Sequence, residues 1–393
     1  MRYAFLSHFS PNACGHGGEH RSYQIAYELG KFTHQEFTAI YDIRLKRACP
    51  PVPHRPLGER VLTKLTRLIK PPVQKRKPVH AESDCARHPG LLRPNDDSIR
   101  KRIRDLITAS DERITLLIEH PGFVALIPSD LRPQVRVLCL PQNMETIDAI
   151  VPDTRRPSKL LDEAEFSEEL DALAQVDDRL VISFVEAGLL NSIGLPAEVY
   201  PYRPVGEIRA FGVRLRSERT PEVGRFVLLG SSTHHTTREG MEWFFGELIN
   251  DPLPQKICID VVGSGTDALV SRLAPGHPNI RGLGFVPDDI LYGMLSRATA
   301  VLAPQFRGMG TLTKLSELSL AGVPCVTGTH AQYPLDVPPG VCGLPMRWAP
   351  WRQRLLCDAT FAFPDTAAYE RWESRQAGLG DLLRLALPAK SVH

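Results

Sequence analysis

The chain has 393 residues, a length that allows two domains, each large enough to bury its own hydrophobic core. Its 42% apolar and 23% charged content and its formal net charge of +2 are those of an ordinary globular enzyme. No apolar run approaches the roughly 18 residues of a membrane-spanning helix, and the amino terminus has no secretory pattern. Eight scattered cysteines without C-x-x-C spacing favour free thiols in a reducing, cytoplasmic setting over disulfides or zinc.

Short apolar strands alternate with helical patterns along the chain, which predicts an α/β protein with parallel sheets covered by helices. The first unit begins with a strand at 3–7, followed by the glycine-rich segment 14–21 and a helical stretch to Leu29. Pro201 to Pro204 is interpreted as a linker, so the first domain is predicted to comprise residues 1–204. Its later strands are expected at 114–118, 135–140, 180–184 and 197–200.

A basic, proline-rich segment, 46–97, interrupts the first unit. Between Ile43 and Arg104 there are 17 Lys or Arg residues against 5 Asp or Glu. Within this segment, 59–70 has an apolar helical face surrounded by basic side chains. Two interpretations stay open for it: a surface helix packed on the first domain, or a helix lying on an anionic membrane surface. Nucleic acid is not expected as a partner, because no aromatic residues interleave with the basic ones.

The second unit, predicted to comprise residues 205–365, again alternates strands and helices. Its apolar runs lie at 226–230, 259–265 and 280–286, and a helix is expected to begin at Glu239. The remaining residues, 366–393, are helical in pattern as far as Leu387.

A glycine-rich loop and helix between Gly308 and Pro324 form the most informative stretch of the chain. An apolar strand at 298–303 enters the loop, and a helix of about three turns follows, ended by Gly322 and Pro324. Glycines let backbone N–H groups approach a phosphate, and a helix N-terminus favours an anion. Glu317 lies where its carboxylate could accept hydrogen bonds from the vicinal hydroxyls of a ribose. The stretch predicts a nucleotide diphosphate site, although a plain packing device with a solvated Lys314–Glu317 pair has the same pattern.

The string G-x-G-T-x-x-K-x-x-E-x-x-x-A-G-x-P from Gly308 to Pro324 resembles the nucleotide-sugar site of retaining glycosyltransferases with the GT-B fold, particularly family 4. Other segments resemble that family in order and spacing: 14–21, 118–121, 140–145, 226–230, 239–244, 259–265 and 280–286. The resemblance implies two Rossmann-like, doubly wound domains that face a cleft, with the last helix crossing back to the first domain. It also implies transfer of a sugar from a nucleotide-diphosphate sugar to an acceptor hydroxyl, with retention.

The resemblance further implies which side chains would act. The catalytic candidates are His120, Gln142, Glu145, Arg238 and Lys314. The donor-binding candidates are Gly17, Gly18, Gly230, Arg238, Gly263, Ser264, Val286, Gly308, Met309, Gly310, Thr311, Leu312, Lys314 and Glu317. No D-x-D motif is present, so neither a metal nor another cofactor is expected, and basic side chains with helix N-termini would stabilise the diphosphate. Two candidates also fit ordinary roles: Arg238 as a solvated loop residue and His120 as a structural histidine.

Two departures from the family pattern keep other functions open. Met309 stands where relatives often carry a second glutamate, and Gln142 stands where they commonly carry a histidine that could shuttle a proton. The alternatives are a sugar-nucleotide epimerase of the same fold and a catalytically inactive nucleotide- or glycan-binding protein. A dinucleotide oxidoreductase is disfavoured, because the G-x-G-x-x-A match at 263–268 lies in the second half. The acceptor stays open between a glycan, a lipid-linked sugar, a small molecule and a protein. A peripheral position at the inner membrane face depends on 59–70.

Overall fold

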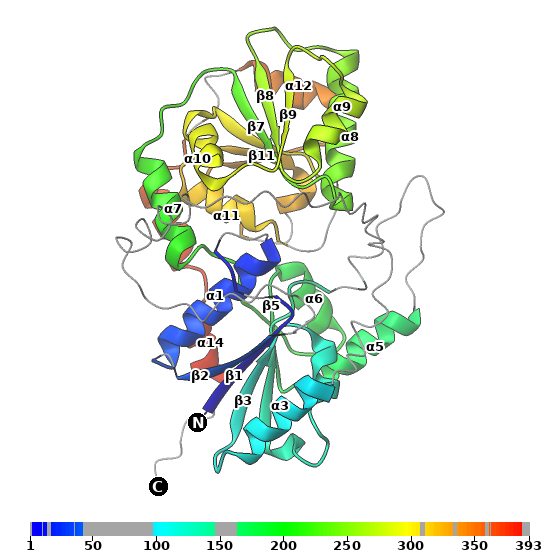
Figure 1. The fold of residues 1–393 in the computed structure, drawn as a ribbon, viewed down its shortest axis with the longest axis vertical. Coiled ribbons are helices and arrows are strands. Elements are labelled where there is room, and N and C mark those ends of the chain that lie inside the picture. The colour runs from blue at the N-terminus through cyan, green and yellow to red at the C-terminus, as the bar shows by residue number, and fades with distance from the viewer. Residues whose placement is uncertain are drawn as a thin grey trace, which may run out of the picture.

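The computed structural model describes residues 2–9, 11–13, 17–34, 36–41, 97–144, 146, 163–306, 311–332, 336–357, 361 and 363–386. Two lobes follow one another along the chain, each built on its own parallel sheet (Figure 1). The basic segment up to Asp96, including 59–70, lies outside the described residues, as do the candidates Glu145, Gly308, Met309 and Gly310. Within the described ranges no helix is both long and apolar enough to span a membrane.

The first sheet contains six parallel strands in the order β2-β1-β3-β4-β5-β6. Its strands are β1 (Arg2–Ser7), β2 (Phe37–Tyr41), β3 (Ile114–Ile118), β4 (Val135–Cys139), β5 (Asp178–Val181) and β6 (Glu198–Val199). The helices of this lobe are α1 (Gly17–Phe32), α3 (Asp97–Thr108), α5 (Glu163–Ala174) and α6 (Phe184–Ser192), with 3-10 turns η1 (Pro121–Leu126) and η2 (Arg132–Gln134).

The central strands β1, β3 and β4 are buried on both faces over most of their length, which explains why they are mainly apolar rather than alternating. Successive side chains point to opposite faces of a strand. Along β1, Phe5 packs with the residues of α1, whereas Ala4 and Leu6 pack with those of α3. Helix α3 supplies three isoleucines, Ile99, Ile103 and Ile107, at helical spacing, and all three are buried.

The second sheet also has six parallel strands, in the order β12-β11-β10-β7-β8-β9. Its strands are β7 (Arg225–Leu229), β8 (Cys258–Val262), β9 (Ile280–Gly284), β10 (Ala300–Ala303), β11 (Cys325–Gly328) and β12 (Val341–Leu344). The helices are α7 (Gly206–Ser217), α8 (His235–Asn250), α9 (Thr266–Leu273), α10 (Asp288–Arg297), α11 (Thr313–Leu320) and α12 (Trp348–Leu356), with the 3-10 turn η3 (Thr329–Gln332). One face packs on α8, α9 and α12, and the other on α7, α10 and α11.

The chain ends by returning to the first lobe, as the family resemblance implied. Helix α13 (Thr366–Ser374) is followed by α14 (Leu379–Ala386), which lies beside α1 (Figure 1). Leu379, Leu382 and Leu383 are buried in the same cluster as Phe5 and Leu29 of the first lobe. Helix α14 therefore contributes part of the core of the first lobe.

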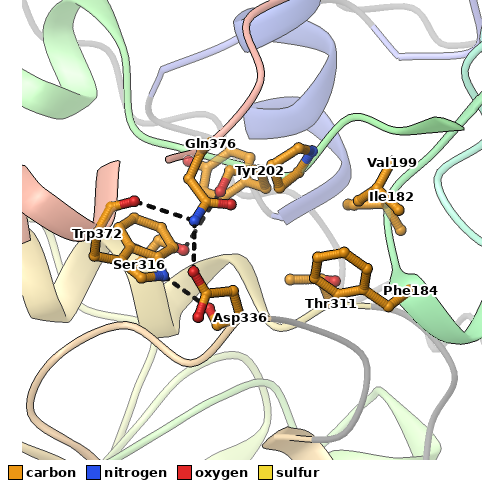
Figure 2. A pocket seen from close by; sticks show the side chains of 10 residues that line it. Ile182, Phe184, Val199, Tyr202, Thr311, Ser316, Asp336, Trp372 and Gln376 are labelled. Atoms are coloured by element: carbon orange, nitrogen blue, oxygen red, sulfur yellow. Dashed lines mark hydrogen bonds between the residues drawn. The ribbon is translucent and has the colours of Figure 1, made fainter. Parts of the chain in front are cut away.

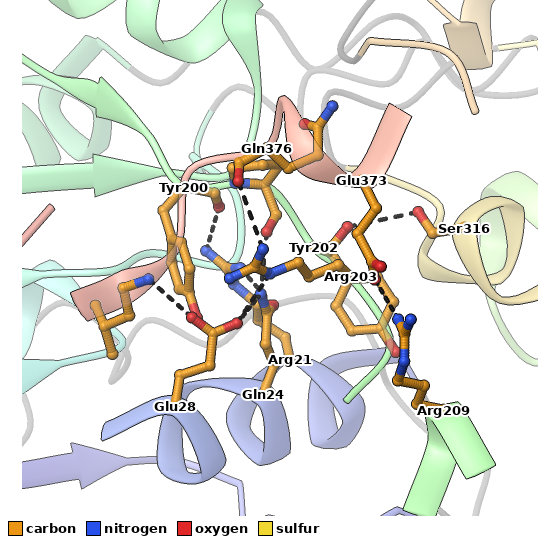
Figure 3. Close-up of polar contacts among 12 residues, drawn as sticks. Arg21, Gln24, Glu28, Tyr200, Tyr202, Arg203, Arg209, Ser316, Glu373 and Gln376 are labelled. Carbon is orange, nitrogen blue, oxygen red and sulfur yellow. Dashed lines mark hydrogen bonds and ion pairs between the residues drawn. The ribbon is translucent and has the colours of Figure 1, made fainter. Parts of the chain in front are cut away.

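A buried polar network joins α1, the linker and the carboxyl-terminal segment (Figure 3). One oxygen of Glu28 accepts a hydrogen bond from Arg203 at 3.1 Å, and the other accepts one from the backbone N–H of Leu379 at 2.8 Å. Arg21 donates to the carbonyl oxygen of Tyr200 at 2.6 Å, with its guanidinium 4.1 Å from the centroid of that ring. The crossing point between the lobes is thus tied to α1 by charged groups that have hydrogen-bond partners.

Two expectations about element boundaries were wrong. The strand expected at 180–184 ends at Val181, because the Ser183 side chain accepts a hydrogen bond from Glu186 N and caps a helix that begins at Phe184. Helix α8 begins at His235, one turn before Glu239. Within the described residues, the helices expected in 366–393 are α13 and α14.

Candidate donor and acceptor site

The carboxyl ends of the two sheets face each other. Helix α1 follows β1 and helix α11 follows β10, and the two helix N-termini meet: a Cβ placed on Gly17 would lie 3.0 Å from Thr313 Oγ1. Strand order reverses beside β1 in the first sheet and beside β7 in the second. Ligands of open α/β sheets bind outside the carboxyl ends of the strands at such reversals. Both candidate half-sites therefore open toward the junction of the lobes.

Glu317 lies one turn into α11. Two side chains from outside the second sheet contact its carboxylate. Its Oε1 is 2.7 Å from His20 Nδ1 of α1 and accepts a hydrogen bond from the Tyr202 hydroxyl at 2.6 Å. Burial opposes ionisation of this carboxyl, but the charge and hydrogen bond of His20 and the hydrogen bond of Tyr202 outweigh it, so the pKa of Glu317 is lowered. Glu317 is an ionised hydrogen-bond acceptor at neutral pH.

The same contact changes the pKa of His20. Burial disfavours its charged form, yet the charge and hydrogen bond of Glu317, with further contributions from Glu19 and Asp288, raise the pKa of His20. Sequence reasoning missed both His20 and Tyr202. His20 follows the glycine pair by two residues, and this proximity was the available signal.

Lys314 lies near Gly230 at the end of β7. Its Nζ donates to the carbonyl oxygen of Leu229 at 2.8 Å, and a Cβ on Gly230 would come within 3.4 Å of that nitrogen. Burial lowers the pKa of Lys314, partly offset by Glu317. Lys314 thus lies close to both Gly230 and Glu317 and is held by a backbone carbonyl.

The loops after β7 and β8 are bound to each other. Gly263 has φ +137°, and a Cβ there would lie 2.0 Å from the carbonyl oxygen of Gly230, so glycine is required. Ser232 N donates to the carbonyl oxygen of Ser264 at 3.0 Å. Arg238 is exposed on the first turns of α8, which also begins at this edge of the sheet.

The remaining donor candidates lie around α11 and β9. Leu312 is the N-cap of α11 and makes no side-chain capping bond. Thr311 Oγ1 is buried and has no hydrogen-bond partner within the described part of the chain. Val286 follows β9 and packs against the core on the α7, α10 and α11 face.

A narrow pocket adjoins this junction (Figure 2). Phe184 and Tyr202 come from the first lobe and linker, Thr311 and Ser316 from the α11 region, and Asp336 from the loop after η3. Asp336 accepts a hydrogen bond from Gln376 at 2.9 Å. The pocket links the α11 N-terminus to the crossing segment.

In the first lobe, Glu119 is a buried carboxyl group. It follows β3 and accepts hydrogen bonds from the hydroxyls of Ser7 and Ser22, the latter at 2.8 Å to each oxygen. Burial raises the pKa of Glu119 to about 7, although those hydrogen bonds and the charge of Arg21 oppose the shift. Sequence reasoning named its segment but not Glu119 itself.

The two acceptor-side candidates in the described residues take different positions. Gln142 donates from Nε2 to the carbonyl oxygen of Gly18 at 3.2 Å. His120 is buried at the N-cap of η1, where its Nδ1 accepts a hydrogen bond from Gly122 N at 3.1 Å. Burial, with a smaller effect of His8, lowers the pKa of His120 to about 3. This histidine is neutral at physiological pH and caps a turn.

No cluster of three or more His, Cys, Asp or Glu side chains suited to a metal ion occurs in the described ranges.

Several solved structures share this architecture. The sucrose-phosphate synthase of Thermosynechococcus elongatus matches with a TM-score of 0.64 at 15% identity, over 98% of this chain and 97% of that one. HepE of Anabaena in complex with UDP and glucose matches with a TM-score of 0.58 at 12% identity, over 98% of both chains. TarM of S. aureus, in a complex that contains UDP, gives 0.52 at 12% identity, over 74% of this chain and 58% of that one.

At these identities the likeness establishes the fold. No protein-family model matches the chain, and no curated protein matches it either. The chain has the two-domain GT-B fold that the sequence predicted, with two parallel six-stranded sheets and flanking helices.

Proposed function

We propose that the chain is a glycosyltransferase that moves a sugar from a nucleotide-diphosphate sugar to an acceptor hydroxyl. One observation carries the proposal: the N-termini of α1 and α11 converge where Lys314 and Glu317 also lie. Helix N-termini bind phosphate, a lysine adds positive charge, and an ionised carboxylate binds ribose hydroxyls. The fold is shared with HepE, solved with UDP and glucose, so a UDP-sugar is the first donor to test.

The proposed reaction retains the configuration of the sugar and needs no metal, as in the family 4 enzymes that the sequence resembles. The bond between the anomeric carbon and the phosphate oxygen breaks as the acceptor oxygen bonds to that carbon. The acceptor proton passes to an oxygen of the departing diphosphate, since Gln142 cannot carry a proton. Lys314, Arg238 and the helix N-termini stabilise the charge that develops on the diphosphate.

The experiment begins with a thermal-shift screen of nucleoside diphosphates and nucleotide sugars, because a bound ligand raises the melting temperature by mass action. The best donor is then incubated with candidate acceptors, with and without EDTA, and released nucleotide and product anomer are measured. Release of nucleoside diphosphate in EDTA, with a product of unchanged anomeric configuration, supports the proposal. Isomerised donor without nucleotide release would indicate an epimerase, and binding without chemistry an inactive binding protein. A requirement for Mg²⁺ would contradict metal independence.

A further inference from the structure

The carboxylate proposed to bind the ribose already has partners in the free protein. Oε1 of Glu317 bonds with both His20 and Tyr202, at 2.7 and 2.6 Å. A carboxylate oxygen has two lone-pair positions, so these contacts occupy it fully. A ribose whose two hydroxyls bind one to each oxygen of Glu317 must therefore displace one of these two groups.

The same two helices also touch at their N-termini. A Cβ on Gly17 would lie 3.0 Å from Thr313 Oγ1 and 4.0 Å from Thr313 Cβ. A phosphate oxygen that accepts a hydrogen bond from each helix needs roughly 2.7–3.2 Å on either side. The contact between Gly17 and Thr313 and that between His20 and Glu317 are together called the closed contact below; they hold the N-termini of α1 and α11 against each other.

The displaced partner is expected to be His20, because Tyr202 is buried at 1% exposure whereas the His20 side chain is 15% exposed. The charges that face His20 come from three helices: Glu19 on α1, Glu317 on α11 and Asp288 on α10. Lys314 faces Glu317 on the same helix. All three carboxylates favour the protonated imidazole, so the pair is strongest where His20 is charged.

We propose that the closed contact competes with the nucleotide: in the free protein His20 occupies the ribose-binding carboxylate, and donor binding requires the His20–Glu317 pair to break and α1 to separate from α11. This proposal rests on the proposed function. It adds that, in the free protein, the carboxylate meant for the ribose is occupied by the protein's own His20. The pair opposes nucleotide binding most below the ordinary histidine pKa of ~6.5, and it weakens as pH rises through the raised pKa of His20.

The first test compares UDP binding by the unaltered protein and His20→Ala, using calorimetry at several pH values. Removing His20 is expected to tighten binding by roughly three- to tenfold below pH ~6.5, the scale of a partly buried ion pair, and the ratio should approach one at about pH 9. Lys31→Ala removes a cation from the exposed last turn of the same helix and should leave affinity unchanged. Weaker binding by His20→Ala would overturn the proposal, because His20 would then be a ligand for the nucleotide.

The second test holds the contact closed. The distance of 4.0 Å between the Cβ positions of residues 17 and 313 falls within the roughly 3.5–4.5 Å of a disulfide. The double variant Gly17→Cys, Thr313→Cys should lose UDP binding when oxidised and regain it when reduced, with the oxidised unaltered protein as the control. Equal affinity in both states would overturn the proposal. If the reduced double variant does not bind UDP, the comparison with His20→Ala alone decides whether the proposal holds. Failure of the unaltered protein to bind any nucleotide would instead count against the proposed function.

Discussion

The side-chain amide of Gln142 donates a hydrogen bond to the backbone carbonyl oxygen of Gly18 at 3.2 Å. This contact joins the segment after β4 to the first turn of α1, so one acceptor-side candidate holds the glycine pair proposed to approach the diphosphate. Gln142 also lies beside Glu119, whose ionised form it favours. The glutamine found in place of a histidine thus has a positioning role that depends on its ability to donate a hydrogen bond.

Gln142→Ala is expected to lower the unfolding free energy by about 1 kcal/mol, the usual net worth of a hydrogen bond. It should also lower turnover more than it changes nucleotide affinity, because the α1 turn loses its support. Urea denaturation and steady-state kinetics measure the two effects. Gln134→Ala, at an exposed position in η2, is the matched control. A change in donor affinity alone would contradict the positioning role.

Glu119→Gln should alter how stability depends on pH. The folded-state pKa of about 7 lies above the ordinary 4.5, so the folded protein binds more protons between these values and Glu119 destabilises it as pH rises. The difference in unfolding free energy between the unaltered protein and the variant should therefore fall by about 3 kcal/mol from pH 4.5 to 7, then level off. Urea denaturation across that range measures it. A pH-independent difference would show that folding leaves the pKa of Glu119 unchanged.

Glu317→Ala, made in the His20→Ala background, should weaken nucleotide binding by roughly 1.5–3 kcal/mol, the scale of hydrogen bonds to a charged group. The His20→Ala background is needed because removing Glu317 from the unaltered protein also releases the closed contact. That release would offset the loss of nucleotide affinity. Calorimetry with UDP gives the comparison. Unchanged affinity in the double variant would remove Glu317 from the ribose site.

Leu383→Ala should destabilise the first lobe although it lies near the carboxyl terminus. This side chain is 1% exposed, in the cluster that contains Phe5 and Leu29. Deleting a buried leucine side chain costs about 2–5 kcal/mol. Denaturation should show this loss, whereas Asp381→Ala, at an exposed position of the same helix, should have little effect. Equal unfolding free energies for the two variants would mean that α14 does not contribute to the hydrophobic core.

The basic stretch at 59–70 carries the prediction of membrane contact. If it binds anionic lipid, replacing Lys64, Arg67 and Lys70 with Gln should reduce cosedimentation with anionic vesicles while the melting temperature stays the same. Binding should also weaken as salt rises, because surface charges are screened. Negligible binding to vesicles by the unaltered protein would favour the other interpretation, a helix packed on the first domain.

The sequence by itself determined the layered architecture and the position of Lys314 and Glu317 on one helix. Apolar strands and helical stripes are patterns of neighbouring residues, so they can be recognised without tertiary information, and β3 was predicted to the residue. Lys314 and Glu317 lie within one helix, so their spacing already places them on the same face. The predicted boundaries of elements were wrong where a single side chain determines them. Ser183 is an example, because it follows the end of β5 and its side chain caps α6.

Only the tertiary structure decided which groups meet across the two lobes. His20 and Glu317 are 297 positions apart, and Tyr202 is 115 positions from the same carboxylate. Glu119 likewise obtains its raised pKa from burial among residues of β1, α1 and the segment after β4. Local patterns do not encode such contacts, because they depend on how two completed sheets and the returning α14 pack. The charge states of the proposed site are therefore properties of the folded molecule.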